Sequence, residues 1–126
     1  MKVSKIDGQG NHLLLECYDG NFDSLNDENL IKNFLEILPS KLKLNKISEA
    51  QVVGYNKEEL ESGISGMIMM AESHISIHTY PKKNFAVADV FSCKEFNVEE
   101  CLRILKNRFG FKKINKKLIV REYERD

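Results

Sequence analysis

The sequence lacks tryptophan, contains only two prolines, and shows no excess of charge of either sign. Lysine and arginine together number 19, as do aspartate and glutamate, so the formal net charge is +0. This balance gives no electrostatic reason to expect a nucleic acid or an anionic membrane as a partner. We therefore predict that the protein binds neither.

Cysteine is scarce, and long apolar runs are absent. Cys17, Cys93 and Cys101 are odd in number and form no C-x-x-C pair, which favours thiols in a reducing, cytoplasmic compartment. No apolar run approaches the ~20 residues that span a bilayer, and the N-terminal stretch MKVSKIDGQGNH lacks the apolar core of a signal peptide. The chain of 126 residues is long enough for one domain with a real core, which we expect to span 1–126.

The spacing of apolar residues predicts six strands and two helices in the order β-α-β-β-β-β-α-β. The first helix is expected to begin at Ser24 or Asp27 and to stop at Pro39, and the second to run from an Asn97 cap to Gly110. The expected strands cover 12–18, 47–55, 64–71, 73–80, 85–93 and 116–124. Short consecutive strands joined by tight turns indicate an antiparallel sheet, so the predicted fold class is α+β, a two-layer sandwich with both helices on one face.

Two helices cannot cover both faces of a six-stranded sheet. The apolar residues that we expect to remain on the uncovered face are Met67, Met69, Ile75, Ile77 and Val87. A sheet-to-sheet homodimer would bury them. A smaller or strongly curled sheet is the alternative.

The stretch ESHISIHTY alternates strictly and places polar residues on one face of a strand. His74, Ser76, His78 and Tyr80 share that face, whereas Ser73 falls on the other. Four residues of strand span roughly 13 Å, too far for His74 and His78 to bind one zinc ion through bonds of about 2.0–2.1 Å. We therefore predict no metal site.

Three kinds of nucleophilic chemistry can be weighed against these residues. No G-x-S-x-G elbow is present, which argues against a serine hydrolase, while a Cys–His thiol protease has no local signature. A serine that attacks its own backbone needs only a hydroxyl at a sharp turn, a base and a group that steadies the oxyanion. Ser73 lies at such a junction, Ser65 is expected close to it across a hairpin, and His78 follows on the same strand. Ordinary structural roles for a lone histidine or cysteine stay open at this point.

Several segments resemble the S-adenosylmethionine decarboxylase family in its small prokaryotic and archaeal form. The likeness covers about residues 11–110, and its most specific part is 72–93. The segments that carry it are LLLECYD (13–19), GISG (63–66), ESHISIHTYP (72–81) and FAVADVFSC (85–93).

The resemblance implies a pyruvoyl enzyme that is made as a proenzyme. The chain would cut itself between Glu72 and Ser73, giving a β chain, 1–72, and an α chain, 73–126. Ser73 would become a pyruvoyl group, a covalent form of pyruvate, which forms a Schiff base with the substrate amine and takes up electrons as CO₂ leaves.

Further roles are implied residue by residue. His78 matches the residue that moves a proton during processing, and Ser65 matches a residue that assists it. Cys93 matches the family's proton donor in catalysis. The implied substrate is S-adenosylmethionine, and the product is the aminopropyl donor for spermidine synthesis.

The chain departs from the family pattern before its GISG segment. The family's aromatic-x-Pro is missing from YNKEELESG, and Tyr55 is the residue that could replace its aromatic side chain. Tyr55, Tyr18 and Phe91 are our candidates for binding the sulfonium of the substrate through an aromatic face. Tyr80 stands where tryptophan is common. These changes leave arginine or ornithine open as substrates, with the acidic loop 58–61 facing their cationic tails. A small-ligand binding module without enzymatic activity is the rival class.

Overall fold

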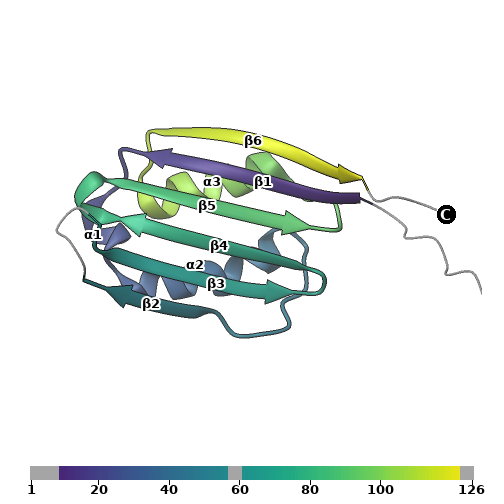
Figure 1. Cartoon of the computed structure of the whole chain (residues 1–126), viewed down its shortest axis with the longest axis horizontal. Coiled ribbons are helices and arrows are strands. Elements are labelled where there is room, and N and C mark those ends of the chain that lie inside the picture. The colour runs from purple at the N-terminus through teal and green to yellow at the C-terminus, as the bar shows by residue number, and fades with distance from the viewer. Residues whose placement is uncertain (1–8, 57–60, 123–126) are drawn as a thin grey trace, which may run out of the picture.

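The computed structural model describes residues 9–56 and 61–122, which form one antiparallel six-stranded sheet backed by helices (Figure 1). The strand order is β2-β3-β4-β5-β1-β6. The strands are β1 (Gln9–Tyr18), β2 (Gln51–Tyr55), β3 (Gly63–Met70), β4 (Ser73–Tyr80), β5 (Phe85–Ser92) and β6 (Lys113–Glu122). The helices are α1 (Phe22–Leu25), α2 (Glu28–Lys41) and α3 (Val98–Phe109), with a 3₁₀ turn η1 (Pro81–Lys83). The α+β two-layer prediction is confirmed, with α1 as an additional short helix.

Local sequence explains where the helices begin and end. The Asp27 carboxylate accepts a hydrogen bond from the backbone N–H of Leu30, and Asn97 caps α3 in the same way. Gly110 ends α3 in the left-handed conformation, at φ 72°. The prediction that Pro39 stops the first helix is wrong, because α2 continues to Lys41. Proline removes one hydrogen bond from the last turn, and the bonds around it carry the helix two residues further.

The helices cover one face of the sheet and lie behind it in Figure 1. α2 and α3 meet through Phe34 and Phe109, whose ring centroids are 5.2 Å apart at a steep angle. Gly66 lets α2 approach β3, since a Cβ atom there would lie 2.7 Å from Cδ1 of Leu35. The core therefore occupies the space between the sheet and the two long helices.

Alternation along β4 decides which residues reach that core. Ile75 and Ile77 are 1% and 0% exposed and face the helices, so the prediction that they belong to the uncovered face is wrong. The hairpin register sets Met67 opposite Ser76 and Met69 opposite His74, which puts both methionines on the other face, where they are 45% and 52% exposed. We call this helix-free side the open face.

Among residues 9–56 and 61–122, the helices are too short and too polar to span a bilayer. The second strand begins at Gln51 rather than at 47, and the last begins earlier than expected, at Lys113. The expected loop 58–61 lies outside the described residues except for Glu61.

Candidate active site

Ser73 is the first residue of β4 and follows a two-residue turn, Ala71–Glu72. It stands opposite Met70 on β3 and Ser92 on β5, so its strand is paired on both sides from the first residue. Its side chain lies on the helix side of the sheet, and the residue is only 9% exposed. The serine thus has the predicted position at a sharp reversal, in a largely dry setting.

Cys93 lies just past the end of β5, at the Ser73 end of the sheet. It directly follows Ser92, which is the cross-strand partner of Ser73. Cys93 is partly exposed, whereas Cys17 and Cys101 are buried. Burial raises the pKa of both buried thiols to about 12, with a smaller effect of Cys101 on Cys17. Of the three thiols, Cys93 is therefore the one that is partly exposed and that directly follows the cross-strand partner of Ser73.

Ser65 and His78 form a pair on the open face. The Oγ atom of Ser65 lies 2.7 Å from Nδ1 of His78, and the two residues are cross-strand partners. They do not lie at the junction: five residues of strand separate His78 from Ser73, about 16 Å. The prediction that Ser65 lies close to the cleavage site is wrong, because the tight hairpin pairs Ser65 with His78 instead.

The candidate substrate-binding tyrosines lie at the same distant end of the sheet. Tyr55 lines a pocket of about 440 Å³ together with Tyr80, Phe85, Val87, Lys83 and Glu61. Tyr80 stacks on Phe85 at 5.9 Å, and Tyr18 packs against Phe85 at 5.1 Å. The open face therefore carries an aromatic cluster, Tyr18, Tyr55, Tyr80 and Phe85, on the His78 side.

Phe91 does not belong to this cluster. It lies near the Ser73 end, where its ring packs against His74 at 5.5 Å and against His12 at 6.1 Å. The Arg121 guanidinium lies over the same ring at 4.8 Å. Phe91 thus sits among cationic and titratable groups rather than in an aromatic pocket.

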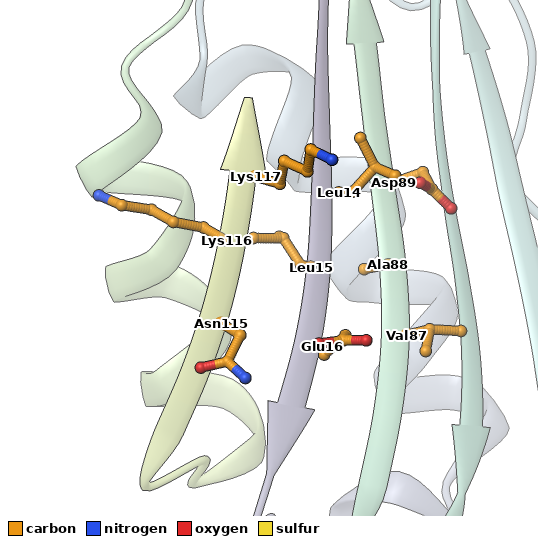
Figure 2. Close-up of a pocket in the computed structure, with 9 residues that line it drawn as sticks. All are labelled: Leu14, Leu15, Glu16, Val87, Ala88, Asp89, Asn115, Lys116 and Lys117. Atoms are coloured by element: carbon orange, nitrogen blue, oxygen red, sulfur yellow. The ribbon is translucent and has the colours of Figure 1, made fainter. Parts of the chain in front are cut away.

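A second, smaller pocket of about 360 Å³ lies across the middle of the open face (Figure 2). Glu16, Asp89 and Lys117 from three neighbouring strands line it, and Nε2 of His12 lies 3.2 Å from Oδ1 of Asp89. No local sequence pattern predicts these neighbours, because β1, β5 and β6 come from separate parts of the chain. In the part of the chain that the structure describes, no three metal-binding side chains gather in a way that could hold an ion.

The described residues thus include a serine at a strand junction, a thiol at the same end of the sheet, and a hydroxyl–imidazole pair farther along the open face. The family model for S-adenosylmethionine decarboxylase matches residues 11–122, and the chain belongs to that family. The resemblance seen in the sequence is confirmed.

Individual relatives agree with this assignment. The chain is 39% identical over 87 residues to an S-adenosylmethionine decarboxylase proenzyme of Thermodesulfovibrio yellowstonii, covering 68% of this chain and 60% of that protein. It is 38% identical over 101 residues to the proenzyme of Moorella thermoacetica, covering 79% and 77%. The crystal structure of the Aquifex aeolicus adenosylmethionine decarboxylase has the same fold, with a TM-score of 0.77 at 24% identity over 94% of this chain and 95% of that one.

Proposed function

We propose that this chain is a pyruvoyl-dependent S-adenosylmethionine decarboxylase that is made as a proenzyme and supplies the aminopropyl donor for spermidine synthesis. The proposal rests on family membership and on one observation: the motif serine begins a strand that is hydrogen-bonded on both sides. Cleavage at Glu72–Ser73 would leave residue 73 held by β3 and β5. The products would be the β chain, 1–72, and the α chain, 73–126.

The residues around position 73 fit a pyruvoyl group. The group is about the size of the serine it replaces, and residue 73 is enclosed but not sealed, at 9% exposure. Once formed, the keto group would withdraw electrons from the substrate as CO₂ leaves. Cys93, beside it, would give a proton to the substrate α-carbon, a type of general acid catalysis that contributes typically 10²–10⁴-fold.

The processing residues require a second copy of the chain. Ser65 and His78 lie about 16 Å along the strand from Ser73, too far for proton transfer within one protomer. The open face presents Val53, Met67, Met69 and Ile119 at 43–63% exposure, an apolar surface that a symmetric partner would cover. We infer a homodimer, packed through the open faces, in which His78 of one protomer serves Ser73 of the other.

The same dimer would bring the aromatic cluster to the reacting end of the partner. Tyr55 and Tyr18 would then contact the adenosyl group and the sulfonium of the substrate, an attraction of about 0.5–2 kcal/mol for the cation. The absence of disulfides among the three cysteines fits a cytoplasmic protein.

One experiment distinguishes decarboxylation of S-adenosylmethionine from decarboxylation of arginine or ornithine, and an enzyme from a binding module. Purified protein is offered S-adenosylmethionine, arginine and ornithine separately, CO₂ release is measured, and the intact mass is recorded with and without borohydride reduction. We expect two polypeptides, a reducible carbonyl on the shorter one, and CO₂ from S-adenosylmethionine. Ser73→Ala should stay whole and inactive. An undivided wild-type chain without a carbonyl would leave only a binding module.

A further inference from the structure

Two buried serines face each other where the chain is expected to cut itself. Ser73 on β4 and Ser92 on β5 are direct cross-strand partners, 9% and 0% exposed, on the helix side of the sheet. Directly opposite residues have Cβ atoms about 4.5–5.5 Å apart, so the Ser92 side chain lies beside that of Ser73, which carries the attacking hydroxyl. The Ser65–His78 pair of the same chain is about three times farther away.

The hydrogen bond between Ser92 and Lys94 uses an acceptor position of the Ser92 hydroxyl. The Oγ atom of Ser92 accepts a hydrogen bond at 3.0 Å from the backbone N–H of Lys94. A hydroxyl carries one donor hydrogen besides its acceptor lone pairs, so the Ser92 O–H can still donate. The Lys94 bond also fixes the Ser92 oxygen in place, which is the preorganisation that an oxyanion-binding donor needs.

The first step of self-cleavage generates an oxyanion beside this hydroxyl. The Ser73 Oγ atom attacks the Glu72 carbonyl carbon, a C–O bond forms, and negative charge develops on the carbonyl oxygen. The C–N bond then breaks, the Ser73 amine takes up the hydroxyl proton, and an ester replaces the amide. In a nearly dry site that charge needs a hydrogen-bond donor.

We propose that Ser92 is a catalytic residue of proenzyme processing, whose hydroxyl donates a hydrogen bond to the Glu72 oxyanion. It is unchanged at the end of the step. The inference rests on the proposed function.

Removing one oxyanion donor typically costs 10²–10³ in rate. We therefore expect Ser92→Ala, made by cell-free translation and sampled over time, to convert to the two-chain form 10²–10³ times more slowly than wild type. The block should precede the ester, so hydroxylamine, which cleaves esters, should not split the accumulated chain. Ser92→Cys has a side chain of similar volume but a weaker hydrogen-bond donor, so its processing should also be slow. This variant replaces Ser92→Ala in the experiment if Ser92→Ala does not fold.

Asn11→Ala is the matched control. Its amide donates to the Lys94 carbonyl at 3.5 Å, so this variant loosens the same turn and leaves the Ser92 hydroxyl intact. It should be processed at the wild-type rate. Equal slowing in Asn11→Ala would overturn the inference in favour of a structural role, as would hydroxylamine cleavage of Ser92→Ala or wild-type processing in a folded Ser92 variant. An uncut wild type would overturn the proposed function as well.

Discussion

Two chains that are each unable to process themselves should restore cleavage when they are produced together. Within one protomer, five residues of β4 separate Ser73 from His78, about 16 Å, while proton transfer needs contacts near 3 Å. We therefore expect Ser73→Ala alone to stay whole and His78→Ala alone to be cut slowly or not at all.

In a mixed dimer, one site combines Ser73 of the His78→Ala chain with His78 of the Ser73→Ala chain. If equal amounts of the two chains pair at random through a two-fold interface, about half of the His78→Ala chains sit in mixed dimers and should be cut. The Ser73→Ala chains should remain whole. Tags of different mass allow intact-mass measurement to assign each product.

The control replaces the Ser73→Ala chain by the double variant Ser73→Ala/His78→Ala, which offers no imidazole to its partner. Cleavage of the His78→Ala chain should then disappear. If mixed dimers purified through both tags stay uncut, or if the double variant works as well, His78 does not act across the dimer, and the two-copy site is wrong.

Iodoacetamide should alkylate Cys93 much faster than Cys17 and Cys101 at pH 8, because burial raises the pKa of the latter two thiols to about 12. Peptide mass spectrometry measures the three alkylation rates. Faster labelling of a buried thiol would contradict the described packing. Cys93→Ala should be processed normally but lose roughly 10²–10⁴-fold in CO₂ release, and full activity would remove Cys93 from proton donation. Glu36→Gln should lower the free energy of unfolding by about 1–3 kcal/mol near neutral pH, since this carboxylate accepts a hydrogen bond from the Ala50 backbone N–H, which holds its pKa below the ordinary value of 4.5. Because the pKa of Glu36 is lowered in the folded state, the difference in the free energy of unfolding between the variant and wild type should be constant above about pH 5 and shrink as pH falls through the lowered pKa. Urea titrations at several pH values measure this difference, and a difference that grows in acid would contradict the assignment.

Strand alternation and helix caps made most of the fold predictable. The 73–80 pattern placed Ser73 and His78 on opposite faces, and the Asn97 and Gly110 signals bounded α3 correctly. The mistake with Ile75 and Ile77 came from assigning apolar residues to the open face without applying that same alternation. The mistake with Ser65 had a similar origin, since counting back from a two-residue turn pairs it with His78.

Sequence reasoning could not reach contacts that depend on the order of strands from distant parts of the chain. β1 lies between β5 and β6, so Asn11 stands beside Ser92, and His12 meets Asp89. No local pattern encodes such neighbours, because the pairing is decided by how the whole apolar face packs. The position of Asn11 beside Ser92 is therefore known only from the sheet register.

The strand order also determines what the proposed backbone cut would do to the molecule. β1 belongs to the segment before Ser73, yet it pairs with β5 and β6, which belong to the segment after Ser73. β3 and β4 also pair with each other across the position of the cut. Strands of the two fragments alternate in the sheet, so neither fragment could dissociate without breaking the backbone hydrogen bonds between paired strands. Maturation would thus turn one polypeptide into an inseparable pair while the architecture keeps its shape.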